Sequence, residues 1–369
     1  MRIIVSGGGT GGHVYPVLAV LNALRQLVEA GREELDALYV GGGGSIEAEL
    51  SAREEIAFEA IAGGGLRGLS MGTVLRNGLS LVRGLLQSAR IVRRFGPDVV
   101  FATGGYVCAP VVTAAWMSGC PTIVYLPDIE PGLAVKALSR VVDRVAVSFA
   151  VSRRHLPVKK VVVTGYPVRR SLRFGERAAA RERLGLASDG FVLLVLGGSR
   201  GAHSINVAVA GIVPSLVEGC EIIHVCGRAD LDWLKDLRGG LPVSQRGRYR
   251  VHDYLHQEVA DAMVAADLVV ARAGAATMGE FPAARLPSIL VPYPFSGHHQ
   301  DPNADYMVAQ GAAMKLDNEE LADRLESVIR ELMSDPQRLA RMAERARSMF
   351  VPDAAERAAR EIVRLASGQ

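Results

Sequence analysis

Short apolar runs recur along the chain, and longer segments of helical periodicity separate most of them. Within these runs the apolar residues follow one another without strict alternation with polar residues. Such runs are typical of parallel strands that helices cover on both faces of the sheet. We therefore predict an α/β protein with parallel sheets. The predicted strands are 2–6, 38–40, 99–103, 122–126, 161–164, 191–196, 221–225, 268–271 and 288–291.

The second half of the chain repeats the plan of the first half. Strand 2–6 leads into a glycine loop at 7–13, and a helical pattern follows from about Pro16. Strand 191–196 leads in the same way into a glycine loop at 197–202 and a helix. We predict that each half is a doubly wound, Rossmann-like domain with a glycine loop after its first strand.

Length and composition support two folded domains. A chain of 369 residues is long enough for two, since one hydrophobic core rarely grows past about 250–300 residues. Hydrophobic residues make up 49% and charged residues 22%, which excludes a disordered chain. We expect an N-terminal domain at 1–165 and a C-terminal domain at 166–350, with the hinge at 165–167. The segment 351–369 ends in a helix that could pack on either domain, including back on the N-terminal one.

The net charge argues against nucleic-acid binding, and the interrupted apolar segments argue against a membrane-spanning helix. The formal net charge of +3 is too small to indicate nucleic-acid binding. Residues 99–127 carry no charge, but Gly104, Pro110 and Gly119 interrupt them, so they cannot form one membrane-spanning helix. No signal peptide precedes the first strand, and cysteines without zinc spacing favour buried thiols in a reducing cytoplasm. The cysteines are Cys108, Cys120, Cys220 and Cys226.

The first glycine loop suits an anionic ligand. Gly7, Gly9 and Gly12 satisfy G-x-G-x-x-G, in which backbone N–H groups and a helix N-terminus face an anion. Binding of NAD would also need a carboxylate near the end of the second strand, for the ribose. Here the second strand runs into the glycines 41–44, which disfavours NAD. A purely structural strand-to-helix turn remains an alternative.

Two further clusters follow predicted strands in the second half. Loop 197–202 carries Ser199, whose hydroxyl can donate to a phosphate oxygen, and the small residues 274–279 let main-chain N–H groups approach a phosphate. Glu280 could bind a sugar diol, or it is a solvated helical residue. Ligands bind beyond the carboxyl ends of strands in open α/β sheets. These positions therefore predict a ligand that carries a diphosphate.

A polar loop follows the predicted strand 288–291. It contains His298, His299 and Gln300, with Asn303 three residues later. Amide and imidazole groups at this spacing could bind sugar hydroxyls, and an ordinary polar surface loop is the alternative.

A metal site is not expected. Asp230 and Asp232 have the Asp-x-Asp spacing that metal-dependent transferases use, but they lie just before a helical pattern that begins near Trp233. We interpret them as a helix cap.

Residues 60–97 contain no acidic residue and several arginines. At helical spacing, one apolar stripe lies beside a row of arginines, while Leu81, Leu85 and Val92 form a second arc that suffices to bury the helix. The surplus stripe suits docking on an anionic membrane leaflet. A broad core face with a solvated arginine edge is the alternative. The stripe is Leu75, Leu79, Val82 and Leu86, and the arginines beside it are Arg76, Arg83 and Arg90.

Several segments, spread over nearly the whole chain, resemble segments that occur in the same order in the MurG family. These are the N-acetylglucosaminyltransferases that complete lipid II in peptidoglycan synthesis. The likeness is carried by 8–16 (GGTGGHVYP), 104–107 (GGYV), 165–169 (GYPVR), 197–202 (GGSRGA), 272–280, and Gln300 with Asn303. The resemblance implies the GT-B fold, with two Rossmann-like domains facing across a cleft. It implies UDP-N-acetylglucosamine on the C-terminal domain, and a lipid I acceptor on the N-terminal domain at the cytoplasmic face of the cell membrane.

The resemblance also implies roles for individual residues. Arg169 and Ser199 would contact the diphosphate, Leu255 the uracil through its backbone, and Glu280 the ribose. The implied donor-binding set is Thr10, Gly11, Gly12, Asp128, Arg169, Ser199, Leu255, Ala275, Ala276, Thr277, Glu280, Gln300 and Asn303. The implied acceptor-binding set is Gly104, Gly105 and Tyr106.

The chain departs from the family at one segment. Where the family usually has His-Glu-Gln-Asn after the fourth strand, this chain has 125–128 (YLPD). Leu126 replaces a carboxylate that the family uses near the acceptor, and Asp128 takes the Asn position. Arg200 in place of the usual Gln is a smaller change.

The implied reaction is an inverting displacement by the C4 hydroxyl of the muramyl sugar. His13 is the candidate base, because an imidazole titrates near neutral pH, and Asp128 is the second candidate. His13 could instead order the loop or bind acceptor phosphate. Arg169, Ser199 and loop N–H groups would stabilise the leaving diphosphate, without a required metal.

Three other functions remain open from the sequence. A UDP-N-acetylglucosamine 2-epimerase shares the two-domain architecture. A related transferase would use another lipid or natural-product acceptor, which the change at 125–128 favours. A donor-binding scaffold that needs a partner subunit is the third, but two glycine-loop halves and His13 in one chain speak against it.

Overall fold

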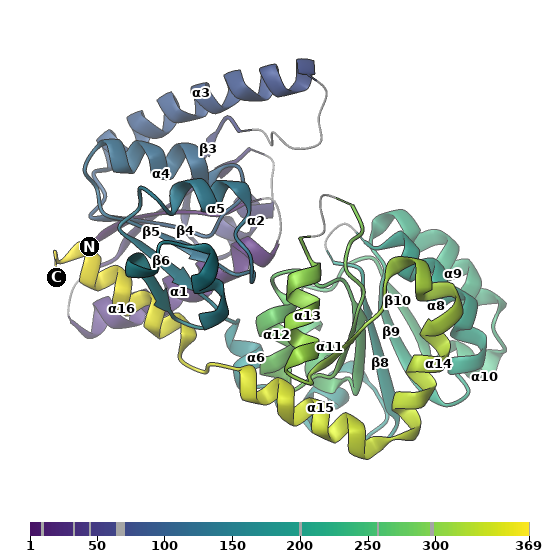
Figure 1. Cartoon of the computed structure of the whole chain (residues 1–369). Helices are drawn as coiled ribbons and strands as arrows, with labels where there is room; N and C mark the ends of the chain where they lie inside the picture. The colour runs from purple at the N-terminus through teal and green to yellow at the C-terminus, as the bar shows by residue number, and fades with distance from the viewer. Residues whose placement is uncertain are drawn as a thin grey trace. The chain divides into compact units, whose positions relative to one another are not determined.

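The computed structural model describes residues 1–369 except 9–10, 32–33, 44–45, 64–70, 199–200, 257, 296–298 and 369, and only the backbone of 11, 46 and 71–79. Two compact units are present (Figure 1). Unit 1 comprises Met1–Arg169 and Val351–Gln369, and unit 2 comprises Arg170–Phe350. Among the expected site residues, Thr10 and Ser199 lie outside the described residues, as do Arg200 and His298.

Unit 1 contains a seven-stranded sheet in the order β3-β2-β1-β4-β5-β6-β7, and all of its strand pairs are parallel. The order reverses between β1 and β4, as in a doubly wound sheet. The strands are β1 (Arg2–Ser6), β2 (Asp36–Gly42), β3 (Ala57–Ile61), β4 (Val99–Ala102), β5 (Thr122–Leu126), β6 (Arg144–Val147) and β7 (Val161–Val163).

Alternate residues of these strands enter two cores. Ile3 and Val5 of β1 pack beneath helices α1 (Gly11–Ala30) and α16 (Ala354–Ala366). Ile4 packs on the opposite face, in the core that α3 (Met71–Phe95), α4 (Cys108–Met117) and α5 (Leu133–Leu138) cover. Because both faces are covered, the strands are apolar at consecutive positions, as the sequence pattern requires. The remaining helices of unit 1 are α2 (Ile46–Arg53), η1 (Ala150–His155) and η2 (Val158–Lys160).

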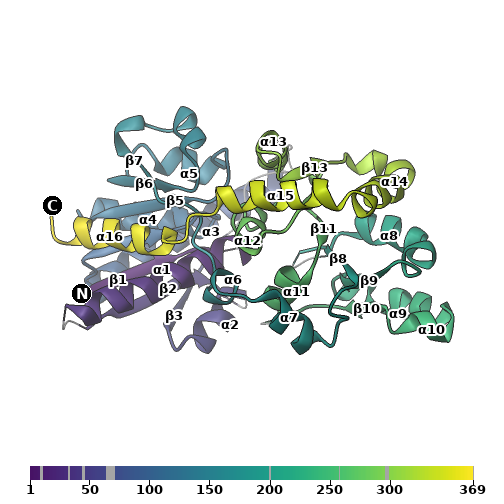
Figure 2. The same cartoon turned by 90° about the horizontal axis from the view of Figure 1, so that it is seen from below.

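The C-terminal helix α16 belongs to unit 1. It lies alongside α1, as Figure 2 shows, and it buries Ala358, Ala359 and Ile362 completely. The two alanines let the helix backbones approach closely. Val351, the first residue of the C-terminal segment that belongs to unit 1, lies against Gly165. A Cβ on Gly165 would come within 2.6 Å of the Val351 Cβ.

Unit 2 contains a six-stranded parallel sheet in the order β10-β9-β8-β11-β12-β13. Its core fills one face of the sheet beneath α8 and α14. The strands are β8 (Phe191–Leu196), β9 (Cys220–Val225), β10 (Tyr249–His252), β11 (Leu268–Ala271), β12 (Ser288–Leu290) and β13 (Ala313–Lys315). The helices are α6 (Arg170–Arg173), α7 (Arg177–Leu184), α8 (His203–Leu216), η3 (Arg228–Asp230), α9 (Leu231–Gly240), α10 (Val243–Arg246), α11 (Glu258–Ala265), α12 (Thr277–Ala284), α13 (Asp301–Ala309), η4 (Asn318–Glu320), α14 (Leu321–Ser334) and α15 (Pro336–Met349).

The predicted fold class, two doubly wound parallel-sheet domains, is confirmed, and one predicted boundary is wrong. The helical pattern expected from about Pro16 begins at Gly11, so Pro16 lies inside α1. A proline has no N–H to donate to the carbonyl four residues earlier, that of Gly12. The hydroxyl of Tyr166 donates to the Gly12 carbonyl instead, at 3.3 Å.

None of the described helices is both long and apolar enough to cross a membrane. The four cysteines are free thiols, of which Cys108, Cys220 and Cys226 are buried.

Candidate active site

Two glycine loops meet at the carboxyl end of the unit 1 sheet. Gly7 and Gly8 follow β1, and Gly104 and Gly105 follow β4, the neighbouring strand. Gly105 has φ of +86°, and a Cβ there would lie 2.5 Å from the carbonyl oxygen of Gly8. A Cβ on Gly7 would lie 2.2 Å from Thr103 Oγ1. Glycine is therefore required on both sides, because backbone packs directly against backbone or side chain.

His13 is oriented by the second of these loops. Its Nδ1 lies 2.8 Å from the Thr103 carbonyl oxygen, and Thr103 Oγ1 donates back to the His13 carbonyl at 2.6 Å. A carbonyl oxygen only accepts, so Nδ1 carries the proton and Nε2 of the neutral ring carries the lone pair. A Cβ on Gly104 would lie 3.3 Å from His13 Cε1. The half-buried imidazole therefore has one defined tautomer, and the close approach of Gly104 restricts its position.

Residues 166–169 contact the start of α1. The Cζ atom of Arg169 lies 3.9 Å from the ring centroid of Tyr15, which is a cation–π distance. Tyr166 donates to Gly12 nearby. Unit 1 thus brings Gly12, His13 and Arg169 together at one end of its sheet.

The family departure at 125–128 lies mostly in the cores of unit 1. Tyr125 is fully buried, and its hydroxyl lies 2.6 Å from Ser148 Oγ and 3.3 Å from the Gly165 carbonyl oxygen. Burial raises the pKa of the Tyr125 hydroxyl, so it remains a hydrogen-bond donor. Leu126 is buried in the opposite core. Asp128 is the first residue of this segment that is partly exposed.

In the loop after β4, the side chain of Tyr106 is accessible. Tyr106 is 43% exposed, and its ring packs close to Gly63.

In unit 2, the loop after β8 contains two residues with positive φ, a backbone conformation that glycine adopts easily. Gly198 and Gly201 have φ of +75°, and a Cβ on Gly201 would lie 2.5 Å from the Cys226 carbonyl oxygen. The loop leads directly into α8, whose first N–H groups have no partners within the helix.

A second helix start lies after β11. Thr277 donates through Oγ1 to the Gly274 carbonyl oxygen at 2.6 Å and begins α12, while 274–276 remain partly exposed. Glu280 is only 5% exposed, so it is not the solvated helical residue that the sequence left open. Leu255, after β10, is half-buried.

The side chain of Asn303, which the sequence places near the sugar, is bonded within unit 2. Asn303 is fully buried, and Nδ2 donates to the Ala273 carbonyl oxygen at 3.0 Å. This bond fixes the segment that precedes α12. Gln300 is partly exposed, and its Oε1 accepts from the Tyr293 N–H at 3.0 Å.

Asp230 occupies the N-cap position of α9, as the sequence predicts, but its side chain makes no capping hydrogen bond. Its carboxylate lies 2.8 Å from His203 Nδ1 and accepts from Asn206 Nδ2 at 2.7 Å and Trp233 Nε1 at 2.9 Å. These bonds lower the pKa of Asp230 against the opposing effect of burial. His224 completes the network through Asn206, and burial lowers its pKa to about 3, so it is neutral.

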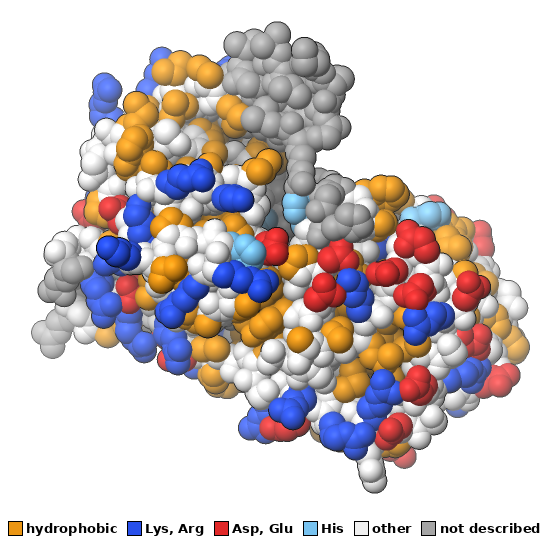
Figure 3. Space-filling view, viewed as in Figure 1, with side chains coloured by type: hydrophobic (Ala, Val, Ile, Leu, Met, Phe, Trp, Pro, Cys, Tyr) orange, Lys and Arg blue, Asp and Glu red, His pale blue; other side chains and the backbone are white. Residues whose placement is uncertain are grey.

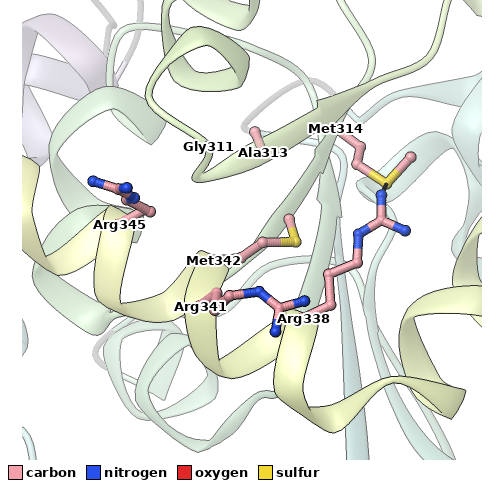
Figure 4. Close-up of a pocket in the computed structure, with 7 residues that line it drawn as sticks. All are labelled: Gly311, Ala313, Met314, Arg338, Arg341, Met342 and Arg345. Atoms are coloured by element: carbon pink, nitrogen blue, oxygen red, sulfur yellow. Dashed lines mark hydrogen bonds between the residues drawn. The ribbon is translucent and has the colours of Figure 1, made fainter.

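In the described part of the chain, no metal cluster coincides with the predicted residues. No group of three or more His, Cys, Asp or Glu is placed there to hold a metal ion. A shallow pocket of about 370 Å³ lies between α15 and the start of β13 (Figure 4). Arginines of α15 and Met342 line it, and none of the predicted site residues does.

The basic helix α3 presents apolar side chains to solvent. Val82 and Leu86 are each 59% exposed, and Arg83 and Arg90 are exposed beside them. The side chains of Leu75, Arg76 and Leu79 lie outside the described residues. On the neighbouring α4, Trp116 is 50% and Met117 69% exposed, which the sequence reasoning missed although both end an uncharged helix. Figure 3 shows hydrophobic and basic side chains together over this part of unit 1.

Known proteins match both units. The glycosyltransferase family 28 N-terminal domain matches residues 3–147, and the family 28 C-terminal domain matches 192–358. A UDP-N-acetylglucosamine–N-acetylmuramyl-(pentapeptide) pyrophosphoryl-undecaprenol N-acetylglucosamine transferase from Roseiflexus sp. (strain RS-1) is 43% identical over 97% of this chain and 94% of its own. A transferase of the same description from Desulforudis audaxviator is 41% identical over 96% of this chain and 95% of its own.

Among solved structures, MurG of Acinetobacter baumannii matches with a TM-score of 0.72 and 25% identity, over 98% of this chain and 99% of that one. The identities of the two transferases to this chain extend across both glycine-loop units. The chain therefore belongs to glycosyltransferase family 28 and, within it, to the MurG family of N-acetylglucosamine transferases.

Proposed function

We propose that the protein transfers N-acetylglucosamine from UDP-N-acetylglucosamine to the C4 hydroxyl of the muramyl sugar in an undecaprenyl-pyrophosphoryl acceptor, lipid I, and so forms lipid II. The observation that carries the proposal is the 43% identity to a transferase of that description over nearly the whole chain. The oriented imidazole of His13, between two glycine loops, supports it from the chemistry.

His13 is the proposed base. Its Nδ1–H donates to Thr103, so Nε2 can accept a proton. The C4 hydroxyl oxygen attacks the anomeric carbon, and the hydroxyl proton passes to Nε2 of His13. The bond between the anomeric carbon and the diphosphate oxygen breaks, and UDP leaves with inversion at the anomeric carbon. Asp128 is the second candidate, since it is the one partly exposed carboxylate of the segment 125–128.

The leaving diphosphate needs positive charge and hydrogen-bond donors. The N–H groups at the starts of α8 and α12 would supply donors, together with the hydroxyl of Ser199. Arg169 would add its guanidinium, which the Tyr15 ring holds beside the loop of His13. We expect no required metal, because these groups can balance the charge of the diphosphate.

The remaining donor residues would act at the nucleoside and the sugar. The buried carboxylate of Glu280 would accept hydrogen bonds from the ribose hydroxyls, and the backbone of Leu255 would pair with the uracil. Gln300 would face the sugar. Asn303 would act indirectly, since its amide nitrogen fixes Ala273 next to the small residues Ala275 and Ala276.

The acceptor would bind at Gly104, Gly105 and Tyr106, and the protein would work at the cytoplasmic face of the cell membrane as a peripheral protein. The exposed apolar side chains of α3 and α4, with Arg83 and Arg90 beside them, suit contact with an anionic leaflet.

Product analysis tests the proposal against its nearest rival. A UDP-N-acetylglucosamine 2-epimerase from Neisseria meningitidis shares the fold with a TM-score of 0.69, but at 12% identity this likeness extends to the fold alone. Labelled UDP-N-acetylglucosamine should be incubated with and without a lipid I analogue. We expect label in the organic phase only when the acceptor is present. A new UDP-sugar from donor alone would instead indicate an epimerase.

A further inference from the structure

Arg272 lies at the carboxyl end of β11, and all of its hydrogen-bond partners are neutral. Its Nη2 donates to Ser204 Oγ at 2.7 Å, and its Nη1 lies 3.1 Å from Asn318 Oδ1. The carbonyl oxygens of Val291 and Pro292 are 3.3 and 3.2 Å from Nη1. Ser204 in turn donates to Asn318 Oδ1 at 2.6 Å. One guanidinium therefore connects the start of α8, the segment after β12 and η4.

The charge of Arg272 has no counter-ion within the described residues. No described carboxylate forms an ion pair with it, although its guanidinium is half-buried. Burial lowers the pKa of Arg272 from its ordinary value, but a guanidinium stays protonated at neutral pH. Another arginine of unit 2 does have a counter-ion: the buried Arg181 forms an ion pair with Asp267 at 2.9 Å.

A half-buried cation without a counter-ion is costly, because carbonyl and hydroxyl dipoles compensate only part of its lost hydration. The location of the Arg272 guanidinium indicates which kind of anion would balance its charge. Ser204 is the second residue of α8, directly after the glycine loop, so the guanidinium is bound to the helix end at which free N–H groups favour an anion. An anion placed there would lie beside Arg272.

We infer that Arg272 is a positioning residue for the donor's diphosphate. Arg272 acts through Ser204 to fix the start of α8, and the bound diphosphate balances the charge of its guanidinium. The inference rests on the proposed function, since it assumes a nucleoside diphosphate at the unit 2 glycine loop. Its consequence is specific: Arg272 favours the phosphates of the donor and not its nucleoside.

Calorimetric titrations with UDP and with uridine test this on the full chain. Arg272→Gln keeps hydrogen-bond donors for Ser204 and Asn318 but removes the charge, and Arg272→Lys keeps the charge. We expect Arg272→Gln to weaken UDP binding about ten- to thirtyfold and uridine binding less than about twofold. This corresponds to the Coulomb energy of two unit charges about 8–12 Å apart at an effective dielectric near 20. Arg272→Lys should retain most of the UDP affinity. Raising the salt concentration should weaken UDP binding less steeply in Arg272→Gln than in the unaltered protein.

The control is Arg250→Gln, which removes a guanidinium of the same unit that is paired with Glu221 at 2.8 Å. It should leave the ratio of UDP to uridine affinity unchanged. An equal loss for UDP and uridine in Arg272→Gln, or an unaltered salt dependence, would overturn the inference. If the unaltered protein does not bind UDP, the proposed function fails instead.

Ser204→Ala covers the case in which Arg272→Gln does not fold. It breaks the connection to α8 and leaves the charge in place, so a smaller loss confined to UDP is expected. Equal losses for UDP and uridine would again contradict the inference.

Discussion

The contact between the two glycine loops of unit 1 makes a quantitative prediction for Gly105→Ala. Gly105 has φ of +86°, and a Cβ would lie 2.5 Å from the backbone oxygen of Gly8. The substitution therefore adds two costs, left-handed backbone strain and a clash that no side-chain rotation relieves. The strain costs about 1–2 kcal/mol. Because the clash forces one loop to move, we expect a total loss of roughly 3–4 kcal/mol in the free energy of unfolding.

Gly119→Ala is the matched control. Gly119 also belongs to unit 1 and has φ of +72°, but nothing lies within 4 Å of the position its Cβ would take. This variant has the strain without the clash, so it should lose only about 1–2 kcal/mol.

Urea unfolding of both variants measures the difference, and acceptor titrations show whether the loop has moved. Gly105→Ala should raise the KM for a lipid I analogue while the affinity for UDP stays close to that of the unaltered protein, since the substituted loop is in unit 1. Equal losses of stability in the two variants would mean that the loops are not in contact.

Three further predictions concern the base, the membrane surface and acid stability. His13→Gln should lower kcat by about 10²–10⁴-fold, and a loss below tenfold with unchanged donor affinity would reassign the base. Val82→Asp with Leu86→Asp should reduce co-sedimentation with anionic vesicles without changing UDP affinity, and unchanged co-sedimentation would remove the proposed membrane contact. The depressed pKa of His224, about 3, means that the unfolded chain takes up a proton first as the pH falls below about 6.5, so stability should drop by about 2 kcal/mol between pH 7 and pH 5. His224→Gln should flatten that dependence, and an unchanged slope in urea titrations would contradict the assignment of a neutral buried imidazole.

The inner strands could be predicted from the sequence because both of their faces are buried. β1, β5, β8 and β11 are apolar at consecutive positions and coincide with predicted runs. The edge strands β3, β10 and β13 were missed, since they are partly exposed and carry polar residues such as Glu59 and Arg250. The interior strand β6 was missed because Arg140, Asp143 and Arg144 interrupt the apolar pattern around it.

The glycine loops could also be predicted, because their steric requirement is local. The roles of Asn303, Asp230 and Arg272 could not, because each depends on partners far away in the sequence. Asn303 donates to Ala273, Asp230 binds groups on α8 and α9, and Arg272 connects three segments. A residue type indicates what a side chain can bind, and only the fold determines which partner it meets.

Calorimetry with the purified protein shows whether backbone amides after the glycine loops bind the diphosphate of a sugar nucleotide. We expect heat of binding for both UDP and UDP-N-acetylglucosamine at one site per chain, without added metal. An absence of binding heat for both ligands would contradict this expectation.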